Sequence, residues 1–173
     1  MPCASLTQNL NDSCVSSTGG IKSIFVSELD STDTLTISGG TVTALELTTG
    51  KQFFEYNFRK QTGTFTETIT VSEETGSVFY APEVNIVLSK MEISKRNEIK
   101  LLAVNDLQII VLDNNGTYWL VGSQNGMSIS AGTSATGTNY GDLNGYNLTF
   151  GGGEPEPMLQ IPSALIPDLL IPA

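Results

Sequence analysis

The chain has 173 residues, enough for one domain with a substantial core, and 39% of them are hydrophobic. It holds 18 acidic residues, eight basic residues and no histidine, so its formal net charge is −10. The lack of histidine excludes nucleophilic catalysis of the Ser-His-Asp and Cys-His types. Eight scattered basic residues do not supply the clustered positive surface that nucleic-acid binding requires.

The first 20 residues show no apolar period and end in Gly19-Gly20, so we expect an N-terminal arm over 1–20. Cys3 and Cys14 are the only cysteines, and their pairing is open: one disulfide or two free thiols, with the thiols preferred. Two cysteines without histidine make a poor zinc site. No stretch approaches the roughly 20 apolar residues of a membrane span, and we expect no secretory signal.

Two-residue alternation of apolar and polar side chains predicts that the chain is mainly β. Charged residues make up only 15% of the chain, and Thr and Gly are plentiful, which favours strands over long helices. Strands are expected over 21–26, 33–38 and 41–48. Gly39-Gly40 would join the last two as a two-residue hairpin turn, because glycine tolerates positive φ.

A second hairpin is expected over Lys51–Val71. In its second strand one set of side chains alternates with another: Thr64, Thr66, Thr68 and Thr70 with Phe65, Glu67, Ile69 and Val71. One face of this hairpin would be apolar and the other rich in hydroxyl groups. The hairpin should therefore separate a core from water.

One helix is expected, over Ser94–Asn105, with Ser94 as its N-cap and a narrow apolar stripe facing the sheet. The strand before it spans 78–90, and Pro82 within that strand predicts a sheet edge or a bulge. The strand after it, 107–112, reads LQIIVL. Apolar residues on both of its faces are typical of a central strand covered on both sides.

Turn signals follow this central strand. Asp113–Gly116 and Asn125-Gly126 each predict a tight turn between strands. Residues 131–145 are rich in Gly and Thr, and we expect them to form a loop. A last strand is expected where Tyr146, Leu148 and Phe150 alternate with polar residues.

The last segment, 151–173, contains five of the seven prolines, which favours an extended chain. Its apolar residues are Met158, Leu159, Ile161, Leu165, Ile166, Leu169, Leu170 and Ile171. Burying them is worth several kcal/mol, at about 25 cal/mol per Å². The segment either folds back on its own domain or docks on neighbouring subunits. We prefer the contact arm, which gives three parts: an arm over 1–20, a β-rich domain over 21–150 and a Pro-rich arm over 151–173.

No motif for phosphate binding, metal binding or catalysis is present. The Gly-rich runs lack the lysine and the following helix of a phosphate-binding loop. Asp113–Gly116 lacks the ligand spacing and the later glutamate of a calcium loop. No pair of carboxylates is singled out for glycoside hydrolysis. We therefore expect no enzymatic activity, no cofactor and no metal ion.

The order of elements in the second half carries a resemblance. A strand ending in Ser89-Lys90 precedes the expected helix and LQIIVL, and then come DNNGTYWLVGSQNGMSI and GTNYGDLNGYNLTF. This order, together with the opening MPCASLTQNLNDSC, resembles the tail-tube-like structural proteins (major tail and tail ring proteins) of tailed bacteriophages. The resemblance implies a β-sandwich or incomplete barrel with one flanking helix at about 94–105. It also implies a homo-oligomeric ring of six copies.

In such a ring a polar hairpin of each copy lines a channel through which DNA passes without specific binding. Our candidates for the channel lining are Thr64, Thr66, Thr68 and Thr70, and the hairpin over 33–48 would add wall or a contact between rings. The resemblance places the protein in the virion tail, beside other tail proteins, after assembly in the host cytoplasm. The alternative is a virion decoration or fibre protein, or a glycan-binding adhesion module.

Overall fold

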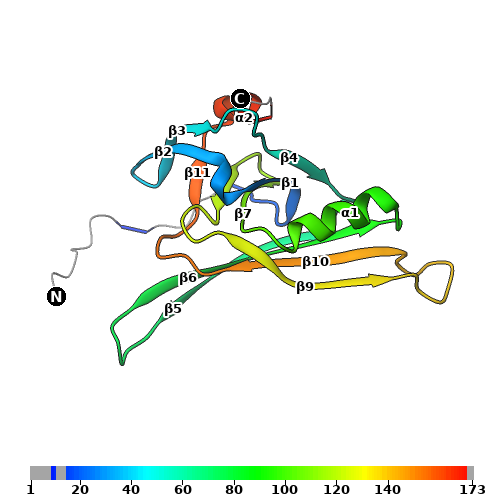
Figure 1. The fold of residues 1–173 in the computed structure, drawn as a ribbon. Helices are drawn as coiled ribbons and strands as arrows, with labels where there is room; N and C mark the ends of the chain where they lie inside the picture. The colour runs from blue at the N-terminus through cyan, green and yellow to red at the C-terminus, as the bar shows by residue number, and fades with distance from the viewer. Residues whose placement is uncertain (1–8, 11–14, 171–173) are drawn as a thin grey trace.

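The structure is a computed structural model, and it describes residues 9–10 and 15–170. Cys3, Cys14 and Ile171 lie outside the described residues, so the state of the cysteines stays open. The chain is mainly β, as the sequence predicts, and its strands form two layers with one longer helix at their side (Figure 1). This agrees with a β-sandwich or incomplete barrel with a flanking helix.

Seven strands form the first layer, a curled sheet in the order β4-β1-β7-β8-β11-β3-β2. They are β1 (Ile21–Glu28), β2 (Thr32–Ser38), β3 (Thr41–Leu47), β4 (Phe54–Asn57), β7 (Leu107–Asp113), β8 (Tyr118–Val121) and β11 (Leu159–Ile161). A 3-10 turn, η1 (Leu29–Ser31), joins β1 to β2. Of the neighbouring pairs, only β11 and β3 run parallel.

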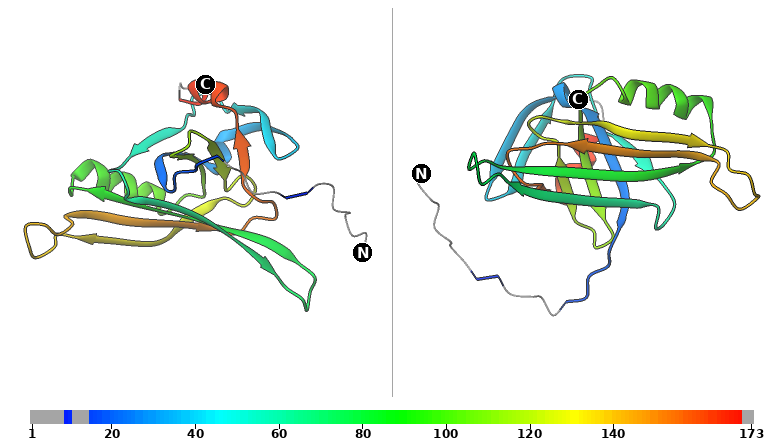
Figure 2. Two further views of the ribbon diagram at one scale, coloured as in Figure 1. Left: turned by 180° about the vertical axis from the view of Figure 1, so that it is seen from behind. Right: turned by 90° about the horizontal axis from the view of Figure 1, so that it is seen from below.

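Four strands form the second layer, in the order β9-β10-β6-β5, and every pair in it is antiparallel. They are β5 (Gly63–Val71), β6 (Val78–Ser89), β9 (Met127–Ala135) and β10 (Gly145–Gly152). The two layers are hydrogen-bonded to each other only where Leu107 pairs with Met127, among the residues described. Figure 2 shows the long second layer spanning the molecule below the curled first layer.

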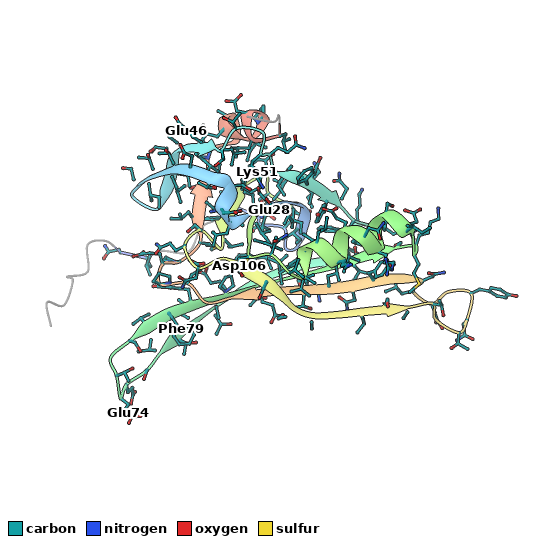
Figure 3. The ribbon with its side chains drawn as sticks, viewed as in Figure 1. Glu28, Glu46, Lys51, Glu74, Phe79 and Asp106 are labelled. Carbon is teal, nitrogen blue, oxygen red and sulfur yellow. The ribbon has the colours of Figure 1, made fainter. Side chains whose placement is uncertain are left out.

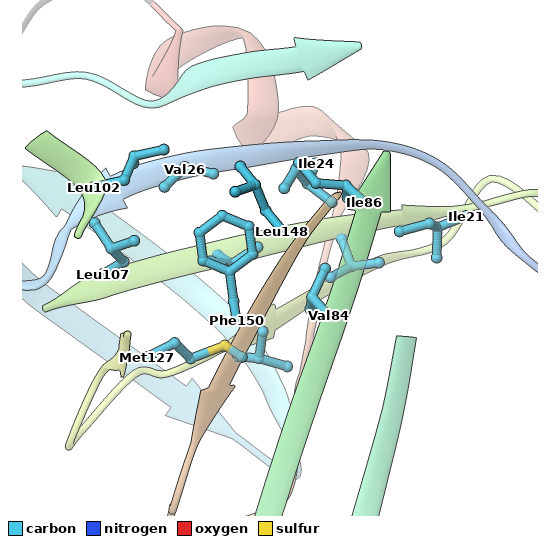
Figure 4. Close-up of a cluster of buried hydrophobic side chains, with 13 residues drawn as sticks. Ile21, Ile24, Val26, Val84, Ile86, Leu102, Leu107, Met127, Leu148 and Phe150 are labelled. Carbon is cyan, nitrogen blue, oxygen red and sulfur yellow. The ribbon is translucent and has the colours of Figure 1, made fainter. Parts of the chain in front are cut away.

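The core between the layers forms because alternate residues of both sheets point inward. Val84 and Ile86 of β6 and Phe150 of β10 pack against Ile24 and Val26 of β1, all of them almost fully buried (Figure 4). Such burial contributes roughly 1.5–3 kcal/mol for each side chain. This core is what fixes the second layer on the first.

Strand β7 is buried on both faces, which confirms the prediction from LQIIVL. Leu107, Ile109 and Val111 face the core between the layers, whereas Ile110 and Leu112 face a second apolar cluster inside the curled sheet. The strand pairs with β1 on one side and β8 on the other. It is the central strand of the fold.

The C-terminal segment is not an extended contact arm in this structure, and here our expectation is wrong. Strand β11 pairs with β8 on one side and meets β3 on the other; η2 (Ser163–Leu165) and α2 (Ile166–Leu169) then close the curled sheet. The second cluster buries Leu159, Ile161, Ile166 and Leu169, with Leu165 and Leu170 packed against it, and Met158 packs against the core between the layers. The prolines permit this path because they lie outside the short strand and at the start of α2.

The expected hairpin over Lys51–Val71 is also corrected. Strand β4 pairs with β1 in the first layer, and β5 pairs with β6 in the second, so the two strands belong to different layers. The chain crosses between layers at Gly63, where a Cβ would lie within 2.8 Å of side-chain atoms of Phe58 and Ile21. Alternation identifies strands, but it does not identify their partners.

Helix α1 spans Ile93–Leu102 rather than Ser94–Asn105, and Glu92 stands at its N-cap position instead of Ser94. The carboxylate of Glu92 forms ion pairs with Lys90 (2.7 Å) and Lys95 (3.4 Å). The helix ends early because the Asn105 side-chain amide donates to the Leu101 carbonyl at 3.1 Å, which satisfies one of its last acceptors. Among the described residues, no helix is long and apolar enough to span a membrane.

The predicted turns are present, with one loop shorter than expected. Gly39 and Gly40 have φ of +57° and +80°, as a two-residue turn between β2 and β3 requires. The loop predicted over 131–145 is confined to 136–144, because β9 continues to Ala135. The expectation of a sheet edge or a bulge at Pro82 is wrong, because β6 lies between β5 and β10: Pro82 pairs with Glu67 of β5, and on the β10 side pairing stops at Glu83 and resumes at the Tyr80–Glu154 bridge.

Candidate functional site

Among the described residues, no element covers one face of the second layer. The core, the curled sheet and α1 all lie on its other side (Figures 1 and 2). Directly paired residues of antiparallel strands point to the same face, so the register gives the composition of this outer face. The outer face consists mainly of short polar and small side chains: Thr64, Thr66, Thr68, Thr70, Ala81, Asn85, Ser128, Ala131, Thr133, Asn147 and Thr149.

The four threonines that the sequence singled out do share this face. Thr64, Thr66 and Thr68 are exposed and Thr70 is half-buried. Their intervening neighbours Phe65 and Glu67 point to the opposite side, toward the first layer and the C-terminal segment. The structure therefore brings the predicted residues together on one surface, and their role as a channel lining stays a prediction.

Hydrogen bonds fix the polar groups at the centre of the outer face. The side-chain amide of Asn85 donates to Asn147 Oδ1 at 2.9 Å and to Thr149 Oγ1 at 2.8 Å. Ser130 Oγ donates to the Thr149 carbonyl at 3.2 Å. Side chains that are hydrogen-bonded in this way lie along the sheet and keep its surface hydrated.

The charge of the outer face is small. Glu83 is the only charged side chain that the register of the four described strands places there. It lines a shallow depression of about 280 Å³ with Thr66, Thr68, Ser130 and Gly151. Without a Lys or Arg in reach, this surface has nothing to hold a phosphate group tightly.

Both lateral edges of the second layer are open. Strand β5 pairs only with β6, and β9 beyond Met127 pairs only with β10, among the residues described. An unpaired strand edge presents backbone N–H and C=O groups that readily accept another strand. The layer therefore combines a bare polar face with two edges ready to pair.

A buried carboxylate, which the sequence did not single out, fastens the connection from β10 to β11. Glu154 is 4% exposed, and its side chain accepts backbone N–H groups of Gln124 (3.1 Å), Asn125 (3.0 Å) and Gly126 (3.1 Å). Its backbone also bonds Tyr80 in both directions, at 2.7 and 2.8 Å. Burial raises the pKa of Glu154 above its usual value, while the three N–H groups act in the opposite direction.

A second carboxylate supports the same connection. Glu67 accepts the backbone N–H of Met158 at 2.9 Å, and burial raises its pKa, opposed by this bond. The only sequence signal for this arrangement is an acid between Gly153 and Pro155 in an otherwise apolar segment. The hydrogen-bond partners of Glu154 lie about 30 residues upstream in a turn, and no local sequence pattern predicts this contact.

A groove of about 480 Å³ lies between α1, β4 and the end of β1. Its polar groups bond one another: Tyr56 donates to Glu98 at 2.9 Å, and Lys51 pairs with Glu28 (Figure 3). Burial and the neighbouring Glu98 carboxylate raise the pKa of Tyr56, so its hydroxyl stays protonated. The groove thus offers an apolar surface with a satisfied polar rim.

Within the described residues no group of three or more His, Cys, Asp or Glu side chains is arranged to hold a metal ion. The features that stand out are instead the polar outer face and the open edges of β5 and β9. Comparison with known proteins adds no relative, because no protein-family model matches the chain and neither the curated proteins nor the solved structures contain a similar one.

Proposed function

We propose that the protein is a structural subunit of a phage tail tube or tail ring, whose copies join side by side around a channel for DNA. One observation carries the proposal: a four-stranded antiparallel layer has two open edges and a bare face of hydroxyl and amide groups. A fibre, decoration or glycan-binding adhesion module is the alternative.

The even number of strands supports closure into a ring. Strand direction alternates across the layer, so β9 and β5 run in opposite directions. When copies stand side by side in the same orientation, the β5 edge of one meets the β9 edge of the next in antiparallel sense. Repeating this contact gives one continuous barrel and removes both open edges of this layer.

The dimensions of such a barrel suit a channel. Six copies, the number that the resemblance implies, would join about 24 strands spaced about 4.8 Å apart. With a strand tilt of roughly 40°, the barrel would be roughly 50 Å across between backbones, and its lumen would be open. DNA could pass through a lumen of this size.

The composition of the outer face supports the same role. Threonine hydroxyls and the amides of Asn85 and Asn147 hydrate a wall without binding phosphate strongly. A subunit with a net charge of −10 repels a polyanion at longer range. DNA would then slide past the wall instead of adhering to it.

The test is a proline placed on the β9 edge. The Thr149 carbonyl faces β9, so the backbone groups of its partner Ala131 face β10. Backbone groups of successive residues in a strand point alternately to the two sides. Ser134, three residues after Ala131, therefore points its N–H to the open edge. Ser134→Pro removes this outward donor while leaving the bonds to β10, and we expect rings to give way to monomers. Ser134→Ala keeps the N–H and is the matched control.

The measurements are solution mass by light scattering and negative-stain images of the same samples. Rings with a central hole for the wild type and Ser134→Ala, and monomers for a folded Ser134→Pro, are the expected result. A wild-type protein that stays at 18.4 kDa at every concentration would refute the ring and favour the decoration or adhesion module.

A further inference from the structure

The β5–β6 hairpin extends beyond the rest of the second layer and ends in a turn at Glu73–Gly76 (Figures 1 and 3). At its end, Ile69 pairs with Tyr80 and Val71 with Val78, and these side chains share the face that carries the core residues Phe65 and Val84 farther back. The apolar face of the sheet thus continues past the core. We call the apolar residues Ile69, Val71, Val78 and Phe79 the hairpin tip.

The cover over this face stops before the tip. The connection to β11 lies over Glu67, which accepts the Met158 N–H, and Glu154 bonds Tyr80. Nothing in the described chain covers the next positions: Ile69 is 63% exposed, Val71 61%, Val78 46% and Phe79, on the other face, 43%. Exposed apolar residues grouped on one projecting element are typical of an interaction surface.

The charge around the hairpin is negative. Its turn carries Glu73 and Glu74, and no Lys or Arg occurs between Lys60 and Lys90. The opposite end of the layer, where α1 begins and β5 starts, holds five of the eight basic residues, Arg59, Lys60, Lys90, Lys95 and Arg96, together with Glu92; Lys100 follows in the last turn of α1. Figures 1 and 2 show these two ends far apart along the strand direction.

Several of these basic residues are available to a partner. In the described part of the chain, ion pairs involve only Lys51, Lys90 and Lys95 among the basic residues. Arg59, Lys60, Arg96 and Lys100 are exposed and have no acidic partner within 4 Å. Ile93, 78% exposed at the start of α1, adds an apolar contact at this end.

We propose that the hairpin tip of one copy docks on the basic end of a second copy, so that rings stack along the strand direction. The proposal rests on the proposed ring: lateral edges close each ring, and the two ends of the layer are left to join one ring to the next. A second copy is the occupant because one chain carries both complementary ends, acidic with an apolar tip and basic with Ile93. A head-to-tail contact of this kind does not close on itself and extends into a tube.

The first experiment removes the apolar tip without removing the strand. The variant Ile69→Thr/Val71→Thr/Val78→Thr keeps β-branched residues in the hairpin. We expect its rings to form as in the wild type, while the protein concentration needed for end-to-end association rises about tenfold or more. Val104→Thr, in the turn after α1 where Val104 is 76% exposed, is the matched control and should leave stacking unchanged.

The second experiment reverses the charges. Glu73→Lys/Glu74→Lys and Arg59→Glu/Lys60→Glu should each weaken stacking, and added salt should weaken it in the wild type. Mixing the two variants should restore mixed stacks, because the two ends are then complementary again between different copies. Sedimentation and negative-stain images give the length distribution in each case.

The outcomes separate the two proposals. Rings that stack equally well in the triple Thr variant, or that lose stacking through Val104→Thr, would overturn the hairpin contact and leave the ring intact. Chains that associate through the hairpin without ever forming rings would keep the contact and refute the ring. A wild type that forms neither would refute both.

Discussion

The two layers of this protein treat their faces differently. The curled layer is apolar on both sides: β7 contributes to the core between the layers through one face and to the second cluster through the other. The four-stranded layer is apolar on one side and carries threonine, serine and asparagine on the other. Both layers contribute to the core between them, and the second also exposes a polar face that its own fold does not use.

The edges of the two layers have different surroundings. In the curled layer the C-terminal segment fills the space between β3 and β8, and the terminal strands β2 and β4 have one partner each. In the four-stranded layer β5 and most of β9 also lack a second partner in the described chain, but these edges border a polar outer face. Under the proposed function neighbouring copies pair with these two edges.

Among the substitutions that test this difference between the layers, Ile161→Ala in β11 should have the largest effect on the free energy of unfolding. Ile161 is almost fully buried in the second cluster, and its truncation should lower the free energy of unfolding by about 2–5 kcal/mol. Gln160→Ala, at the exposed position beside it, should change it by less than about 0.5 kcal/mol. Urea denaturation followed by circular dichroism measures both; equal effects would mean that the segment does not stabilise the subunit.

A smaller effect is expected from Glu154. This residue lies in the connection between β10 and β11, and its side chain accepts hydrogen bonds from the turn between β8 and β9. Glu154→Ala leaves three backbone N–H groups without their acceptor and should cost about 1–3 kcal/mol at pH 7. Glu156→Gln, an exposed carboxylate two residues on, is the matched control. A loss no greater than that of the control would show that the three bonds do not hold the connection.

Glu154 also gives the pH dependence a sign. Because its pKa is raised in the folded state, the folded protein binds the proton more tightly than the unfolded chain does. The pH-dependent part of its contribution to stability, as distinct from its three hydrogen bonds, is therefore largest below the ordinary pKa near 4.5 and is lost as pH rises through the raised value. Glu67, with a pKa raised in the same direction, adds to this trend. Glu154→Gln should flatten the pH dependence of the unfolding free energy, and an unchanged profile would refute this assignment.

How far the sequence predicts this fold depends on the range of the interactions involved. The strands β5 and β7 and the Gly39-Gly40 turn follow from local alternation and from glycine's freedom at positive φ. The pairing partner of β4 cannot be predicted in this way, because an alternating strand can join either layer. The place of the Thr residues on one face follows from the same alternation, and it needed no knowledge of the partners of β5.

The C-terminal segment and Glu154 show the limit. A segment rich in proline and apolar residues is equally compatible with docking on its own core and on a neighbour. Only the gap between β3 and β8, formed by residues more than 30 positions upstream, decides between them. In the same way, the acceptor role of Glu154 depends on a distant turn.

The smallest effect on stability, and the sharpest test of the bare face, should come from Thr64→Lys/Thr66→Lys. Both threonines are exposed on the polar outer face and point away from the core. The unfolding free energy should therefore change by less than about 0.5 kcal/mol. In a ring each copy would add two positive charges to the wall, where they would bind phosphate and slow DNA. Thr64→Ser/Thr66→Ser is the uncharged control. Virions carrying the lysine variant should deliver DNA poorly and the serine variant normally; normal delivery with both would show that this face does not line the path of the DNA.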